Sequence, residues 1–177
     1  DKSSIYGTVL SDSIIRISAG AKTLSFKGLS FSNLSVDGNF LSPEFNVFLK
    51  SSSLNLVGQS DLKDFNASLS TLPDSFVFRL KWDNKDQVLN RGSFTARGSL
   101  TKNEKETGNT VLSIKIDSTG IYSRNNLWKI SPSLITIDTS SISIDKLYVS
   151  NNENYYLVDG SISRNNSDTL SLKFKGI

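Results

Sequence analysis

Hydrophobic and polar residues alternate along most of the chain, with Ser, Asn, Thr or Lys between the apolar positions. Successive side chains of an extended strand point to opposite faces, so a period of two is typical of strands buried on one face only. The clearest segments are 45–49, 76–80, 112–116, 141–144 and 170–174. The pattern predicts roughly ten or more short strands joined as a meander.

Residues that favour turns separate these segments. The turn signals are Asp37-Gly38, Pro73-Asp74, Arg91-Gly92, Ser131-Pro132, Asp159-Gly160 and the polar stretch 102–109. Each signal lies between two alternating segments, which supports a chain of hairpins.

The stretch 60–70 also fits a helix, with Ser60 as N-cap and Leu62, Phe65 and Leu69 at helical spacing. A strand fits as well, because Phe65, Ala67 and Leu69 alternate with polar residues. The neighbouring segments are strands, and the intervening Asn and Ser residues are poor helix formers, so the strand is favoured.

A five-residue unit that begins with Leu-Ser occurs three times between residues 24 and 38. The same phase, apolar at i, i+2, i+5 and i+7, returns at Ile142, Ile144, Leu147 and Val149. It fits either a pentapeptide solenoid or a strand in which a β-bulge shifts the inward phase by one residue. So short a stretch cannot stack the several repeats that a solenoid needs, which favours the bulge.

These observations predict an all-β fold: an elongated, mostly antiparallel meander folded over as a taco-like groove or an incomplete sandwich. The chain 1–177 is interpreted as one β-rich segment of a larger protein, with a possible sub-boundary near 101–110. Its apolar stripe must be covered by a second sheet or by hydrophobic cargo. The residues predicted to line a groove are Phe45, Val47, Leu49, Leu112, Ile114, Ile116, Ile142, Ile144, Leu170, Leu172 and Phe174.

The amino-acid composition excludes several kinds of catalytic and metal-binding chemistry. The chain has no His and no Cys, so it lacks the usual general base near neutral pH, thiolate nucleophiles and the N/S ligands of zinc. The spacing Ser-x-x-Lys is expected by chance in so Ser-rich a chain, and the acidic run Asp83–Asp86 lacks the spacing of a calcium loop. We therefore expect no enzyme activity, no cofactor and no metal site.

Charge points to no particular partner. Twenty Lys and Arg residues against seventeen Asp and Glu residues give a net charge of +3, and the basic residues are scattered. This pattern argues against nucleic-acid binding. The chain contains no Met and opens Asp1-Lys2-Ser3, which suggests a piece of a longer precursor.

The C-terminal third resembles the C-terminal region of the TamB family (translocation and assembly module, AsmA-like superfamily), as found in Bacteroidetes-type proteins. The resemblance begins at Trp128-Lys129-Ile130-Ser131-Pro132, and continues through 135–137, 142–149, 156–163 and 168–172. A second stretch, from 67 to 76 and on through 81–84 to 91–94, is also similar.

The resemblance implies a non-enzymatic periplasmic segment of an inner-membrane-anchored, envelope-spanning protein. Such a segment would shield hydrophobic cargo in lipid transport between membranes, outer-membrane protein assembly or secretion. The partners implied are lipid acyl chains or unfolded outer-membrane protein strands, together with an outer-membrane barrel of the Omp85 type. The alternative from the residues is a carbohydrate-binding or adhesin-type β-sandwich that uses Trp82, Trp128 or Tyr155 as a platform for sugar rings.

Overall fold

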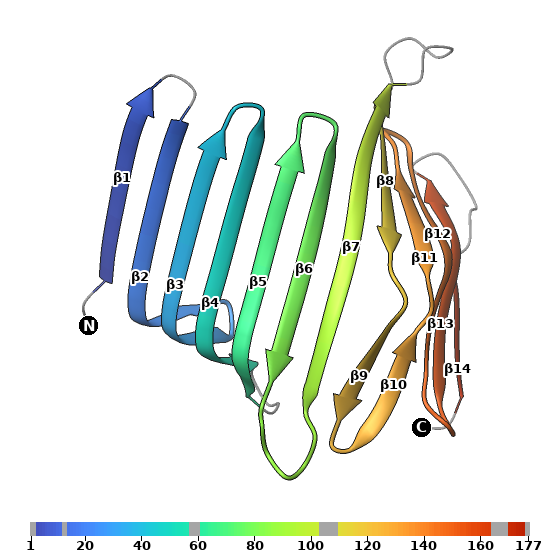
Figure 1. Ribbon diagram of the computed structural model, residues 1–177. Coiled ribbons are helices and arrows are strands. Elements are labelled where there is room, and N and C mark those ends of the chain that lie inside the picture. The colour runs from blue at the N-terminus through green and yellow to red at the C-terminus, as the bar shows by residue number, and fades with distance from the viewer. Residues whose placement is uncertain (1–2, 12–13, 57–60, 103–109, 164–169, 176–177) are drawn as a thin grey trace.

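The computed structural model describes residues 3–11, 14–56, 61–102, 110–163 and 170–175. Fourteen strands form one sheet, and the described residues contain no helix (Figure 1). The strands are β1 (Ser3–Ser11), β2 (Ile14–Phe26), β3 (Leu29–Leu41), β4 (Glu44–Leu56), β5 (Leu62–Leu72), β6 (Ser75–Asp83), β7 (Arg91–Lys102), β8 (Thr110–Ile116), β9 (Thr119–Ser123), β10 (Asn126–Ile130), β11 (Ser133–Ile137), β12 (Ser141–Ser150), β13 (Tyr155–Ser163) and β14 (Leu170–Lys175). The prediction of an all-β, antiparallel meander is confirmed, and the stretch 62–70 is part of a strand.

The sheet is an up-and-down meander with two interrupted strands. β8 and β9 both pair with β7, so together they take the place of one strand that is interrupted near its middle. β10 and β11 both pair with β12 and form a second interrupted strand in the same way. The second break falls at Ser131-Pro132, where proline has no N–H to donate to the ladder. β7 pairs directly with β8, so the sheet is continuous on both sides of the predicted sub-boundary near 101–110, whose residues 103–109 lie outside the described part.

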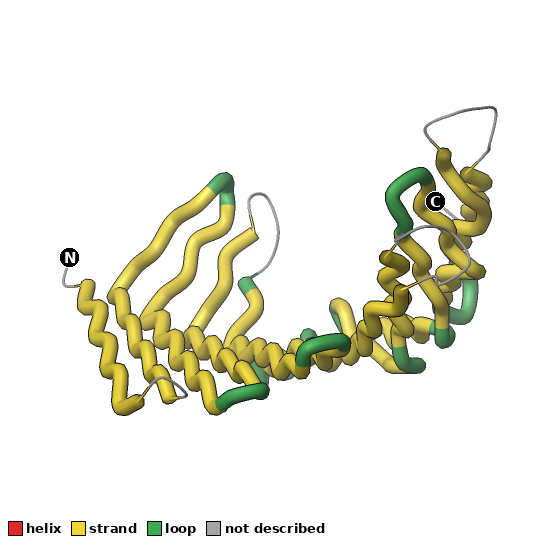
Figure 2. Tube along the Cα trace, turned by 90° about the horizontal axis from the view of Figure 1, so that it is seen from above, coloured by secondary structure: helices red, strands yellow, loops and turns green. Residues whose placement is uncertain are grey.

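The sheet is a single bent layer. In Figure 2 its first and last strands rise on the same side of the middle strands. The accessible surface is 12179 Å², whereas a compact protein of 19.5 kDa exposes roughly 8,500 Å². The excess arises because a one-layer sheet leaves both of its faces accessible. The fold therefore has the groove-like form rather than that of a closed sandwich.

Three predicted turns are wrong, because Asp37-Gly38 and Asp159-Gly160 lie inside strands and Arg91-Gly92 begins β7. Gly92 instead makes room for a neighbouring side chain, because a Cβ on Gly92 would lie 2.5 Å from the Trp82 ring. Asp37 binds across strands, since Ser18 Oγ donates to its Oδ1 at 2.7 Å. This hydrogen bond and a second from Ser35 lower the pKa of Asp37. Pro73-Asp74 does form the β5–β6 turn.

The predicted bulge is confirmed in β12. The register with β13 shifts between Ile144 and Leu147, and Lys146 between them has a φ of 46°. Gly160, in β13 near the same shift, has a φ of 122°. The extra residue keeps Ile144 and Leu147 on one face although they are three positions apart.

The alternation of apolar and polar residues also changes phase in β3, β4 and β5. Phe31 pairs with Leu54 and Val36 with Leu49, and Leu49 packs against the same cluster as Leu54 although five positions separate them. Asn33 in β3 and Asp64 in β5 have φ values of 49° and 46°, in the left-handed region. These kinks explain the repeated Leu-Ser unit: it spans a hairpin and a kinked strand, not the coils of a solenoid.

Aromatic rings lie over glycines on adjacent strands. A Cβ on Gly98 of β7 would lie 2.0 Å from the Phe76 ring of β6, so the ring occupies the space of the absent side chain. Gly92 has the same relation to Trp82. Ring-over-glycine packing covers the weak point that glycine leaves in a sheet.

We predict that Gly98→Val destabilises the protein by about 1–3 kcal/mol, because the Phe76 ring must leave its position. The measurement is urea unfolding followed by circular dichroism. Gly7→Val is the matched control, since a Cβ there would meet only the Arg16 carbonyl oxygen at 4.0 Å. Equal stability of the two variants would contradict the packing described for Gly98.

Candidate functional site

The candidate site is one entire face of the sheet, which we call the apolar face. Residues paired directly across strands share a face, so the register defines its rows. One row runs in order through Phe40, Phe45, Thr71, Phe76, Gly98, Ile114, Ile135, Ile144, Gly160 and Leu170. A second runs through Ile17, Gly38, Val47, Leu69, Phe78, Ala96 and Ile116. The first row reaches from β3 to β14 and the second from β2 to β8, and the described side chains in both rows are apolar or small.

Eight of the eleven residues predicted to line a groove lie on this face. Phe45, Ile114 and Ile144 share the first row, and Val47 and Ile116 share the second. Leu49, Leu112 and Ile142 follow from alternation and pairing. The other three are in β14, where the register pairs Leu170 with Gly160, Leu172 with Val158 and Phe174 with Tyr156.

The apolar face is exposed to very different degrees along its rows. Ile116 is 6% exposed, whereas Phe45 is 36%, Ile142 45% and Ile17 47% exposed. In the described part of the chain no side chain is completely buried, and no second layer covers this face. Away from the kinked positions, alternation in the described strands places one charged residue on this face, Lys102 at the end of β7.

The best-packed part of the apolar face is a cluster of Leu54, Phe65 and Trp82, on β4, β5 and β6. The Phe31 and Phe65 rings are 6.2 Å apart although β4 separates their strands. Trp82 likewise reaches Ile121 across Gly92. Side chains meet across an intervening strand where the sheet curves toward them, so the apolar face lies on the inner side of the bend.

Sequence reasoning missed this cluster. Leu54 and Phe65 lie close to the kinks, where the period of two fails, and the local pattern does not place Trp82 beside them. Strand pairing could have revealed the cluster. The alternating apolar residues of 76–82 need apolar neighbours on the strands before and after them.

The opposite face, here called the polar face, carries Ser, Asn, Lys and Arg, with a few apolar residues such as Phe48. Its charged residues include Lys50, Arg79, Lys81 and the ion pair of Arg97 with Asp117. The two faces of the sheet thus differ sharply in chemistry.

The aromatic residues of the carbohydrate hypothesis do not form one platform. Trp82 is 8% exposed, and its Nε1 donates to Asn90 Oδ1 at 3.2 Å. The Trp128 ring lies 5.6 Å from the Tyr156 ring on the apolar face, while Tyr155 lies 5.6 Å from Tyr148 on the polar face. A sugar ring could not meet all three predicted residues at once.

Within the described ranges, no group of three or more acidic side chains is placed to hold a metal ion. A search of the same residues for a helix able to cross a membrane found none. Comparisons with protein families, with curated proteins and with solved structures found no match.

Proposed function

We propose that this chain is a non-enzymatic segment that shields hydrophobic cargo on its apolar face. The observation that carries the proposal is a bent sheet with one continuous apolar face that no other part of the described chain covers. Burial of apolar surface is favourable whether the covering group is protein or a lipid chain, at about 0.8 kcal/mol for each buried methylene group. Acyl chains or unfolded outer-membrane protein strands would supply that cover.

The resemblance to the TamB family supports the same proposal and gives it a setting. In this setting the chain belongs to an inner-membrane-anchored protein that crosses the periplasm toward an outer-membrane barrel partner. Its role would lie in lipid transport between membranes or in outer-membrane protein assembly and secretion. The sheet form agrees with that setting, because a meander can be extended strand by strand into a long apolar path.

Site-specific photocrosslinking in cells tests the proposal. A benzophenone side chain at Phe45, Leu112 or Ile142, on the apolar face, should capture lipid or outer-membrane protein. Leu72 and Leu134 are matched controls, because they are 50% and 42% exposed on the polar face. Mass spectrometry of the adducts distinguishes lipid from protein cargo. Equal capture from both faces, or no capture from the apolar one, would refute cargo shielding.

A further inference from the structure

We propose that the polar face binds a phosphate-bearing ligand between Lys50, Arg79 and Lys81, a set that we call the cationic triad. The triad is separate from the apolar face and does not depend on what covers that face. Lys50 lies on β4 and pairs with Asn66 of β5, which pairs in turn with Lys81 of β6. Arg79 is two residues from Lys81 on the same strand and pairs with Ser68.

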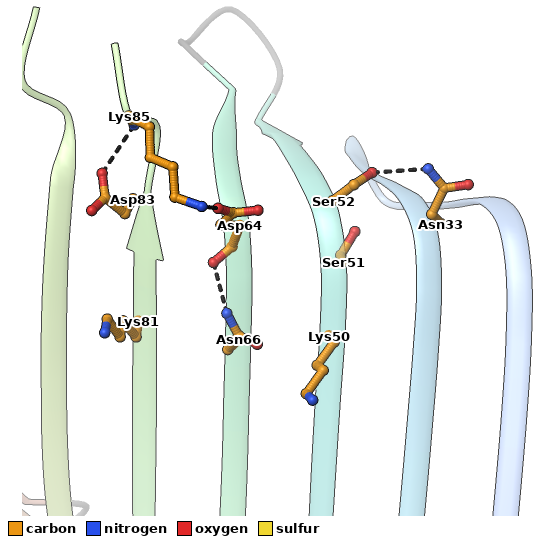
Figure 3. Close-up of a pocket in the computed structure, with 9 residues that line it drawn as sticks. All are labelled: Asn33, Lys50, Ser51, Ser52, Asp64, Asn66, Lys81, Asp83 and Lys85. Carbon is orange, nitrogen blue, oxygen red and sulfur yellow. Dashed lines mark hydrogen bonds and ion pairs between the residues drawn. The ribbon is translucent and has the colours of Figure 1, made fainter. Parts of the chain in front are cut away.

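The triad surrounds short side chains. Neighbouring strands lie about 4.8 Å apart and residues two positions apart on a strand are about 7 Å apart. The three long cationic side chains therefore rise on both sides of Asn66 and Ser68, whose amide and hydroxyl groups can donate hydrogen bonds. Figure 3 shows Lys50 and Lys81 at the same level on either side of Asn66. An oxyanion above Asn66 is within reach of both ammonium groups.

The surface is hollow at this place. Two adjoining hollows of about 430 Å³ and about 190 Å³ share Lys50, Asn66 and Lys81 in their walls. The larger one follows from the kinks described above, since Asn33 and Asp64 contribute to its wall. A phosphate group with part of its substituent fits into a space of this size.

The acidic groups of the larger hollow are already engaged. Asp64 forms an ion pair with Lys85, and Asp83 Oδ1 accepts from the Lys85 backbone N–H at 2.9 Å (Figure 3). Asn66 Nδ2 donates to the Asp64 carbonyl oxygen at 2.7 Å, which holds the middle of the site in place.

A third carboxylate, that of Asp37 on β3, interacts electrostatically with Lys50. Its oxygens accept hydrogen bonds from Ser18 and Ser35. Among the described residues, Lys50, Arg79 and Lys81 form no ion pair with any carboxylate. Three cations outside any ion pair, grouped around a hollow with donor groups, favour a multiply charged oxyanion.

Phosphate could reach the triad as a soluble phosphate compound or as the headgroup of an anionic lipid. Arg79 supplies a planar fork that binds two phosphate oxygens, while the lysines act as point charges from the other side. Phe48, 49% exposed, borders the smaller hollow and could contact the carbon skeleton next to the phosphate.

The test uses the whole chain and two probes: inorganic pyrophosphate by calorimetry, and vesicles of phosphatidic acid in phosphatidylcholine by flotation. The triple variant Lys50→Gln, Arg79→Gln, Lys81→Gln should bind about ten- to hundredfold more weakly than the wild type. The control triple, Arg16→Gln, Lys115→Gln, Lys129→Gln, removes the same charge elsewhere on the polar face and should bind as the wild type does.

Binding of pyrophosphate alone would identify a soluble ligand, and binding of the vesicles alone a lipid headgroup; either result supports the proposal if the triad variant loses it. Absence of binding to both probes would overturn the proposal. Equal weakening in both triple variants would overturn it as well, because it would show a general effect of net charge.

Discussion

Trp82→Ala is expected to destabilise the sheet by about 3 kcal/mol, at the lower end of the range for large aromatic residues in a core. Trp82 is 8% exposed and packs with Leu54 and Phe65, and its ring also covers Gly92 of β7. Its removal breaks a contact that links β4, β5, β6 and β9 through one cluster. We expect a loss of stability at the lower end of that range because the apolar face is open, so water can enter the space that the ring leaves.

The measurement is the free energy of unfolding in urea. Trp128→Ala is the matched control: its ring is half-buried and contacts Tyr156, and we expect it to cost less than half as much. If both variants lose the same stability, or if Trp82→Ala loses less than about 1 kcal/mol, the cluster is not the centre of the fold.

The sequence contains enough information to predict strands, their alternation and the apolar face, because a period of two is a local property. Segments 45–49 and 112–116 are strands as predicted, and their apolar residues share one face. Pairing in a meander follows from chain order, so the neighbours of most strands were also predictable.

What the sequence did not reveal is the role of its glycines. Gly38, Gly92 and Gly160 follow Asp or Arg in the manner of turn residues, yet they lie inside strands. For Gly92 the reason is non-local, because the Trp82 ring on the adjacent strand occupies the space next to it. Gly160 has a φ of 122° beside the bulge of β12. Whether a glycine ends a strand or accommodates a ring depends on the residues of the partner strand. The local sequence pattern carries no information about them.

The cationic triad also escaped prediction. Lys50, Arg79 and Lys81 are scattered in sequence, and only the register β4–β5–β6 brings them around Asn66. A surface that depends on three strands can be found only when the register of all three is known.

The double variant Phe45→Asp, Ile142→Asp should abolish the binding of a fluorescent fatty acid while leaving the protein folded. The two residues are 36% and 45% exposed and lie on different parts of the apolar face, so each carboxylate faces water in the free protein. An acyl chain that covers either residue would have to bury a charge without a partner, which is costly. We expect binding to weaken about a hundredfold or more.

The matched control is Leu72→Asp, Leu134→Asp, which adds the same charge at positions of similar exposure on the polar face. It should bind the fatty acid as the wild type does, and both variants should keep the circular dichroism spectrum of a β-sheet. A loss of binding in the apolar-face variant alone means that the acyl chain is held by the inner side of the bent sheet. Equal loss in both would mean that the fatty acid responds only to charge, and the apolar face would then require a protein partner as its cover.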